Sequence, residues 1–223
     1  MVTQWLQKSM VKGENIVEWV QEVSKVILIP LFAYLLGSIP FGLILTKLFT
    51  SKDVRLQGSK NIGASNVLRV GGPTLALLTL LGDLLKGAVP VFFACSVAAI
   101  NTSGGAIYIS FVAFLSFCGH LYPVYLKFCD GGKGVATAAG CFLVICPVAC
   151  IISVLVFIMV ICFFNRASLG SLAATAVLPV AVSQSTDMKI LTGLSVIIAL
   201  LIFYRHKDNI YRLISGSEIK IWK

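Results

Sequence analysis

Residues 134–164 have the sequence GVATAAGCFLVICPVACIISVLVFIMVICFF, a run of 31 residues without an acidic or basic side chain. As one helix this run would be about 46 Å long, well beyond the hydrocarbon core of about 30 Å that a bilayer offers. Pro147 lies in its middle, where a proline interrupts a helix. We therefore expect two short membrane-spanning helices that meet near Pro147.

Five further apolar runs flank this segment, and the composition agrees with a membrane protein. Hydrophobic residues make up 58% of the 223-residue chain, and charged residues make up 12%, against about 25% in a typical soluble domain. A soluble globule of this size cannot bury so much apolar surface, so a soluble enzyme is excluded. We predict an all-α integral membrane protein with seven transmembrane helices, some of them short. The five further runs are 26–49, 73–100, 106–126, 167–184 and 188–204.

The distribution of charge favours seven helices over six. The chain carries 18 Lys and Arg against 9 Asp and Glu, a net charge of +9. With seven helices, the loops 50–72, 127–133 and 165–166 share one side with the C-terminal tail; with six, Arg166 and the tail change sides. Because Lys and Arg favour the cytoplasmic side, we expect seven spans, an external N-terminus and a cytoplasmic C-terminus. The cations placed in the cytoplasm are then Lys52, Arg55, Lys60, Arg69, Lys127, Lys133, Arg166, Arg205, Lys207, Arg212, Lys220 and Lys223.

Residues 1–25 precede the first apolar run and are not expected to span the membrane. Apolar residues alternate there with balanced charges, which favours an amphipathic helix at the membrane interface over a flexible tail. We therefore divide the chain into an N-terminal extension, 1–25, and a membrane domain, 26–223. The seven cysteines include no CxxC pair and the two histidines are far apart, so no metal or other cofactor is indicated.

The loop GSKNIGASNVLR, residues 58–69, has the composition of an anion-binding site. Its glycines allow positive φ and close backbone approach, so successive N–H groups can converge on an anion. Lys60 and Arg69 add charge, and the planar guanidinium group of an arginine suits a phosphate. The alternative is a simple connecting loop, and the spacing is not that of a Walker A motif. Short neutral hydrogen-bonding groups come from Ser59, Asn61, Ser65 and Asn66.

A second candidate anion site lies at GGKG, residues 131–134. Gly131, Gly132 and Lys133 lead into a helix N-terminus, whose unpaired N–H groups and positive dipole end attract a phosphate. A tight turn between two spans would explain the glycines but not the lysine. His120, shortly before this segment, could equally bond a backbone group at the interface.

Two more polar segments are expected on the same side of the membrane. Ser168 and Ser171 lie one helical turn apart, and spacing alone favours a helix cap over a ligand contact. After the last span, His206 and Asn209 share a helix face and would suit a polar substrate. Basic residues around them could instead bind anionic lipid; these are Arg205, Lys207 and Arg212.

Asp83 and Lys86 lie inside the second apolar run, where ionisable groups are costly and are usually functional or paired. Their i,i+3 spacing lets them pair with each other on one helix face. We therefore favour a structural ion pair that faces the helix bundle over a direct catalytic role.

Taken in order along the chain, six segments resemble one family, the bacterial acyl-phosphate:glycerol-3-phosphate acyltransferases of the PlsY type. The resemblance runs from about residue 30 to 218. Two positions depart from the family pattern: Ser65 replaces the usual Thr, which keeps the hydroxyl, and Asp130 places an acid directly before the glycines. Such an acid would weaken anion binding unless it points away. The six segments are LGSIPFG at 36–42, the 58–69 loop, GDLLKG at 82–87, residues 120–137, SLGS at 168–171 and RHKDNIYRL at 205–213.

The resemblance implies a seven-span enzyme of the bacterial inner membrane with its active site facing the cytoplasm. It would transfer a fatty acyl group from acyl phosphate to the 1-hydroxyl of glycerol 3-phosphate, giving lysophosphatidic acid and phosphate. The family's loop for the phosphate of acyl phosphate corresponds to Ser59, Asn61, Gly63, Ser65 and Asn66. The glycerol 3-phosphate site corresponds to Arg69, Lys133, Ser168, His206 and Asn209, with Gly131 and Gly132 beside the lysine.

The expected chemistry is direct attack of the glycerol hydroxyl on acyl phosphate. Arg69 and Lys133 would offset the developing charge, and His206 or a substrate phosphate oxygen would accept the proton. No HxxxxD motif is present, unlike in the His–Asp acyltransferases that use thioester donors. The expected partners are acyl phosphate, glycerol 3-phosphate and membrane lipid, and not nucleic acid. Two other classes stay open: a transporter of a phosphorylated organic anion and a lipid-binding scaffold.

Overall fold

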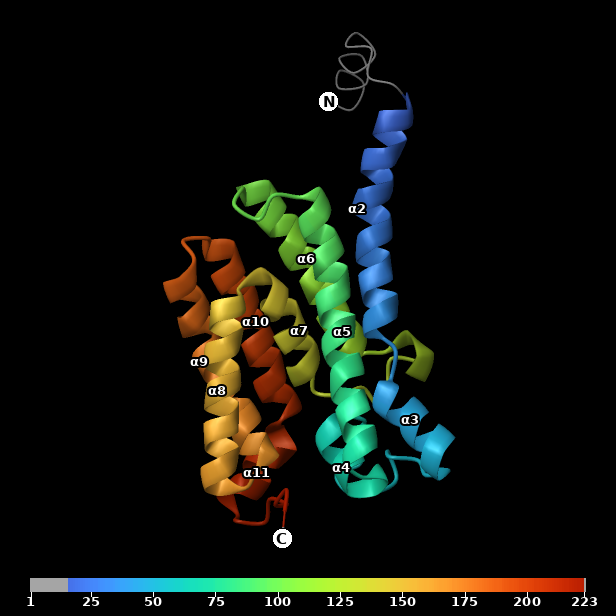
Figure 1. Cartoon of the computed structure of the whole chain (residues 1–223), viewed down its shortest axis with the longest axis vertical. Helices are drawn as coiled ribbons and strands as arrows, with labels where there is room; N and C mark the ends of the chain where they lie inside the picture. The colour runs from blue at the N-terminus through green and yellow to red at the C-terminus, as the bar shows by residue number, and fades with distance from the viewer. Residues whose placement is uncertain (1–15, 223) are drawn as a thin grey trace.

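The computed structural model describes residues 16–222, which form a bundle of helices without a β-strand (Figure 1). The predicted all-α fold is thus confirmed for this part of the chain. The helices are α2 (Ile16–Gly37), α3 (Phe41–Thr50), α4 (Ala64–Gly71), α5 (Pro73–Val97), α6 (Ser103–Leu121), the 3-10 helix η1 (Val124–Leu126), α7 (Val135–Ile145), α8 (Pro147–Phe164), α9 (Ala167–Ser185), α10 (Lys189–Arg205) and α11 (Lys207–Ile214).

The predicted break in the 134–164 run is confirmed. Helix α7 ends at Ile145, and Cys146 has a non-helical backbone with φ −148° and ψ 79°. Pro147 is the first residue of α8, a position where the missing N–H of proline costs no helical hydrogen bond. The run therefore folds as two antiparallel helices, and the shorter one, α7, carries GGKG at its N-terminal end.

The first apolar run, 26–49, is not the single helix that we expected. Helix α2 ends at Gly37, and α3 begins at Phe41 with a bend of 42° between the two axes. Pro40 explains the break, because proline removes a helical N–H and disfavours the α conformation at the residue before it. Helix α2 also continues upstream of the run to Ile16, while residues 1–15 of the predicted interfacial extension lie outside the described part of the chain.

Within residues 16–222, four helices are long and apolar enough to cross a membrane: α5, α6, α8 and α9. The count rises to six if two bent pairs, α2 with α3 and α10 with α11, each form one span. Helix α7 is apolar but shorter than these. An integral membrane protein is the class that these helices support.

Helices α5 and α7 approach each other through glycines. A Cβ atom at Gly87 would overlap the carbonyl oxygen of Thr137, and one at Gly140 would overlap the carbonyl oxygen of Leu84. Small residues of this kind let two helix backbones pack closely where lipid offers no hydrophobic drive for association. The contact fixes the N-terminal end of α7 against α5, and the candidate site is built there.

One end of the bundle gathers the polar loops. In Figure 1, helices α4 and α11 and the C-terminal segment lie at the lower end, while α2 begins at the upper end. The α5–α6 and α9–α10 connections lie toward the upper end. The polar segments that the sequence placed on one side of the membrane are therefore neighbours in space.

Candidate functional site

A cavity of about 350 Å³ opens at the polar end of the bundle and extends between the helices. Its polar part contains every predicted site residue except Gly131 and Gly132, which precede Lys133 in the chain and do not line the cavity. Its other part is apolar and is formed mainly by α7, α8 and α9. The predicted residues on the wall are Ser59, Asn61, Gly63, Ser65, Asn66, Arg69, Lys133, Ser168, His206 and Asn209. The apolar lining includes Phe142, Cys150, Val154, Phe157 and Leu178.

The 58–69 loop is organised by the side chain of Asn66. Its Nδ2 group lies 3.0 Å from the carbonyl oxygen of Val54 and 2.9 Å from that of Asn61. Its Oδ1 atom accepts a hydrogen bond of 2.8 Å from the backbone N–H of Ser59. Gly58 has φ +59°, and a Cβ atom there would overlap Asn66 Oδ1, so this position requires glycine. Asn66 therefore serves the site by shaping the loop, and its polar atoms are largely used inside it.

Arg69, in the last turn of α4, lines the cavity. Its Nε atom is buried and has no hydrogen-bond partner among the residues that the structure describes. Burial lowers the pKa of Arg69 from its ordinary value; the charge of Glu218 opposes this effect and that of Arg212 adds to it. A buried cation with an unpaired donor is a strong binding group for an anion such as phosphate.

Lys133 points to the same place from the start of α7. Its Nζ atom contacts Oδ1 of Asn209, on α11. Burial lowers the pKa of Lys133 to about 8, with Arg212 and Arg205 adding to this effect and Glu218 opposing it. The Lys133 ammonium group therefore lies in a positively charged, partly dehydrated pocket that a phosphate would neutralise.

His206 lies at the 61° bend between α10 and α11 and is almost fully buried. Its Nδ1 atom is 2.8 Å from the carbonyl oxygen of Ile202. Because a carbonyl can only accept, this contact assigns the ring proton of the neutral histidine to Nδ1. The Nε2 atom is then the unprotonated nitrogen, which is the form that a general base needs.

Glu218 is a site residue that the sequence interpretation missed. Its Oε1 atom accepts hydrogen bonds from Ser168 Oγ at 2.7 Å and Asn209 Nδ2 at 2.6 Å, and its Oε2 atom accepts one from Arg212 Nε at 2.8 Å. Burial by itself would raise the pKa of Glu218, but the bonds from Ser168, Arg212 and Asn209 hold it below the ordinary value. An acid in a tail rich in Lys and Arg was the signal available in the sequence.

The contact to Glu218 also bears on the two interpretations of Ser168. Spacing alone favoured a helix cap and the family resemblance implied a substrate contact; the N-cap residue of α9 is Arg166, and no side chain caps that end. Ser168 instead points to the cavity and is held there by the carboxylate group. Glu218 thus orients two predicted substrate-binding groups, Ser168 and Asn209, from a segment beyond α11.

The predicted ion pair between Asp83 and Lys86 is confirmed, with Asp83 Oδ1 2.7 Å from Lys86 Nζ and both side chains buried. Lys86 also donates to the carbonyl oxygen of Ile39 at 2.9 Å, in the break between α2 and α3. His120 Nδ1 lies 3.1 Å from Thr137 Oγ1 and 3.6 Å from Asp83 Oδ1. The pair is therefore the centre of a buried polar cluster that joins α5, α6 and α7, and two of its members, Asp83 and His120, line the cavity.

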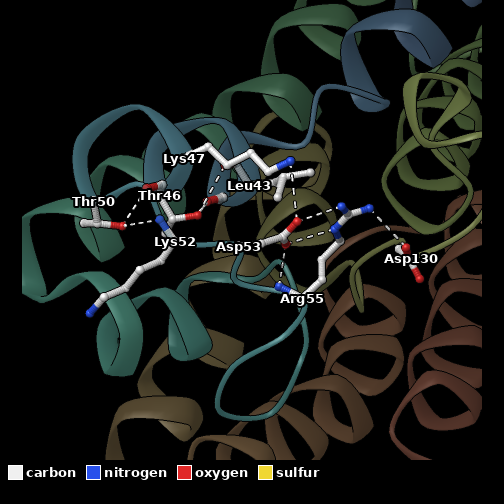
Figure 2. Close-up of polar contacts among 9 residues, drawn as sticks. Leu43, Thr46, Lys47, Thr50, Lys52, Asp53, Arg55 and Asp130 are labelled. Carbon is white, nitrogen blue, oxygen red and sulfur yellow. Dashed lines mark hydrogen bonds and ion pairs between the residues drawn. The ribbon is translucent and has the colours of Figure 1, made fainter.

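Asp130, the acid that departs from the family pattern, pairs with an arginine of another loop. Figure 2 shows its carboxylate group facing Arg55 of the 51–63 loop, with Asp130 Oδ2 3.2 Å from Arg55 Nη1. Arg55 also bonds Asp53 at 2.8 Å, and Asp53 lies 3.4 Å from Lys47. The negative charge of Asp130 is thus balanced by an arginine that does not line the cavity, and this contact links the loop before Lys133 to the segment that precedes the 58–69 loop.

Among residues 16–222, no three His, Cys, Asp or Glu side chains are grouped closely enough to hold a metal ion. The polar groups that line the cavity are instead cations, hydroxyls, amides, two histidines and two carboxylates that are already bonded within the protein, Asp83 and Glu218. Such a set can bind phosphate groups, offset negative charge and accept a proton.

Comparison with known proteins shows which family the chain is similar to. A family model described as glycerol-3-phosphate acyltransferase matches residues 27–216. The glycerol-3-phosphate acyltransferase of Syntrophotalea carbinolica is 47% identical over 188 residues, covering 84% of this chain and 93% of that protein. The enzyme of Desulfotalea psychrophila is 43% identical over 196 residues, covering 87% and 96%.

Two solved structures match the fold. Both are crystal structures of PlsY (YgiH), an integral membrane glycerol 3-phosphate acyltransferase. Its glycerol 3-phosphate form has a TM-score of 0.82 and 35% sequence identity, and covers 87% of this chain and 94% of that one. Its lysophosphatidic acid form has a TM-score of 0.80 and 34% identity, with the same coverage.

Proposed function

The chain belongs to the glycerol-3-phosphate acyltransferase family, and we propose that it transfers a fatty acyl group from acyl phosphate to the 1-hydroxyl of glycerol 3-phosphate. The products are lysophosphatidic acid and inorganic phosphate. One observation carries the proposal: a single cavity joins a phosphate-binding end, with Arg69 and Lys133, to an apolar end between membrane helices. That combination fits one small anionic substrate and one substrate with a long hydrocarbon chain.

We place glycerol 3-phosphate where the cations converge. Its phosphate group lies between Arg69 and Lys133, within reach of Ser168 and Asn209. The phosphate of the acyl donor lies on the 58–66 loop, whose backbone is held open by Asn66. The fatty chain then follows the apolar lining of α7, α8 and α9 into the membrane.

The reaction needs no covalent enzyme intermediate in this arrangement. The oxygen of the glycerol 1-hydroxyl forms a bond to the acyl carbon, and the bond between that carbon and the phosphate oxygen breaks. The electron pair leaves with inorganic phosphate, and the hydroxyl proton goes to Nε2 of His206 or to a phosphate oxygen. Arg69 and Lys133 stabilise the negative charge, and the cavity supplies proximity.

The seven-span topology is supported by the geometry. The four long helices, the two bent pairs and the short α7 give seven spans if each crosses the bilayer. This places the N-terminus outside and the C-terminus, with the cavity mouth, in the cytoplasm. The protein then resides in the bacterial inner membrane and draws glycerol 3-phosphate from the cytoplasm.

The test is turnover by the purified protein in lipid vesicles. With palmitoyl phosphate and labelled glycerol 3-phosphate, we expect lysophosphatidate and phosphate in equal amounts. A thioester donor in place of palmitoyl phosphate should give no product. Uptake of glycerol 3-phosphate into sealed vesicles without acylation would overturn the proposal and favour a transporter.

A further inference from the structure

The loop that carries Lys133 has an unusual backbone. Three non-glycine residues before it have positive φ: Lys127 at 54°, Phe128 at 63° and Asp130 at 53°. Such conformations are uncommon for residues with a Cβ atom and persist where surrounding contacts impose them. The position of Lys133 therefore depends on the contacts that hold residues 127–133 in this conformation.

On one side, the loop is pressed against the end of α6. The N–H of Gly132 donates to the carbonyl oxygen of His120 at 3.1 Å. A Cβ atom at Gly132 would overlap His120 Nε2, and one at Gly131 would overlap the carbonyl oxygen of Leu121. The two glycines thus allow the backbone to lie directly on α6.

On the other side, the loop is held by Arg205, the last residue of α10. Its Nη2 atom donates to the carbonyl oxygen of Gly131 at 2.6 Å, and its Nε atom donates to that of Gly132 at 3.2 Å. Its guanidinium carbon lies 5.9 Å from the ring centroid of Tyr122, within range of a cation–π contact. The rigid fork of arginine donors suits two adjacent carbonyls better than the single ammonium group of lysine.

The two hydrogen bonds from Arg205 fix the orientation of the peptide group between Gly132 and Lys133. A trans peptide is planar, so its N–H points opposite to its carbonyl group. With the Gly132 carbonyl held by Arg205, the N–H of Lys133 points away from Arg205. Arg205 also directly precedes His206 in the chain. The C-terminal end of α10 therefore positions both the loop that carries Lys133 and the candidate base.

We propose that Arg205 is a positioning residue for glycerol 3-phosphate binding, which clamps the Gly131 and Gly132 carbonyls and so presents Lys133 to the substrate phosphate. The inference rests on the proposed function for the identity of the substrate. It takes the place of the alternative that Arg205 anchors anionic lipid, because two of its donor groups, Nε and Nη2, are already bonded to the protein. Arg205 does not line the cavity, so its effect on the substrate passes through the loop.

The test compares Arg205→Ala and Arg205→Lys with Lys207→Ala, which removes a neighbouring exposed cation at the same surface. Rates are measured against glycerol 3-phosphate in vesicles of zwitterionic lipid and in vesicles with added anionic lipid. Calorimetric titration with glycerol 3-phosphate gives a binding constant that does not depend on turnover. Thermal unfolding of each variant in detergent reports whether it is folded.

For Arg205→Ala we expect KM and Kd for glycerol 3-phosphate to rise about tenfold or more, since charge-assisted hydrogen bonds are lost. The KM for acyl phosphate should change much less, Arg205→Lys should recover part of the effect, and Lys207→Ala should match the parent protein. The changes should be equal in both kinds of vesicle.

Two results would overturn the proposal: unchanged KM and Kd in Arg205→Ala, or a defect seen only with anionic lipid, as an anchor predicts. If Arg205→Ala does not fold, Arg205→Lys takes its place in the test: an unchanged KM and Kd, or a defect seen only with anionic lipid, would then overturn the proposal. Failure of the parent protein to acylate would overturn the proposed function instead, and the Kd comparison would still test Arg205.

Discussion

A single residue, Lys133, should make the affinity of the site for glycerol 3-phosphate depend on pH. Because burial lowers its pKa to about 8, Lys133 loses its proton at a lower pH than an exposed lysine does. Glycerol 3-phosphate is a dianion above about pH 7, so its own charge is constant in this range. The affinity for this substrate should therefore fall as the pH rises through about 8.

We expect the KM for glycerol 3-phosphate to increase by up to about tenfold per pH unit above the pKa of Lys133. The measurement is KM between about pH 6.5 and 9.5. The matched variant Lys133→Arg stays charged throughout and should lose the dependence. A KM that is flat in the parent protein to pH 9.5 would contradict a role for the Lys133 charge.

Glu218→Gln tests the residue that the sequence interpretation overlooked. The amide keeps the size of the side chain but loses the charge that three donors share. Weakening hydrogen bonds to a buried charged group costs roughly 1–3 kcal/mol, so we expect kcat/KM for glycerol 3-phosphate to fall about tenfold or more. Asp208→Asn, at an exposed acid of α11, is the control and should have little effect. Equal kinetics for the two variants would argue against Glu218 as the group that orients Ser168 and Asn209.

At the scale of elements, hydropathy and proline predicted most helices, and the failures have local causes. The break at Pro147 follows from length, since one helix there would be too long for the bilayer. The break at Pro40 was overlooked because the 26–49 run has the length of one span, and length alone gave no reason to divide it. The bend there matters, because it exposes the Ile39 carbonyl to Lys86.

The residues of the cavity were predicted better than their contacts. Composition and family resemblance identified ten residues that line it, yet spacing alone favoured a helix cap for Ser168, and lipid binding stayed open for Arg205. The two cases share a cause. The partners of both residues, Glu218 and the glycine carbonyls, are distant in sequence, and spacing reports only on neighbours within a helix.

The glycine contact between α5 and α7 predicts a stability effect. Gly140→Ala would force a methyl group against the Leu84 carbonyl, and overpacking of this kind costs typically 1–3 kcal/mol. Gly193→Ala is the matched control, because that glycine lies in α10 with no atom within 4 Å of an added Cβ. Alanine should be neutral or slightly stabilising there. Thermal unfolding in detergent should separate the two variants, and equal midpoints would contradict close packing of α5 on α7.

At the scale of the whole molecule, the topology can be tested by labelling cysteines. In a background with exposed Cys129 and Cys162 replaced by serine, we compare Gly104→Cys at the start of α6 with Ser217→Cys after α11. A membrane-impermeant maleimide should label Gly104→Cys in intact spheroplasts, but Ser217→Cys only after permeabilisation. Labelling of both in intact spheroplasts would rule out opposite sides and thus the odd number of spans that the seven-span topology requires between these two positions.

The two-part cavity has a consequence for how the kinetics must be expressed. One proposed substrate dissolves in the aqueous phase and the other in the bilayer, so their concentrations have different dimensions. Glycerol 3-phosphate acts at a molarity, whereas acyl phosphate acts at a mole fraction of the membrane or micelle. Adding inert detergent should therefore slow the reaction by surface dilution of the donor, while the KM for glycerol 3-phosphate stays constant. Rate constants for this protein gain meaning only when both phases are specified.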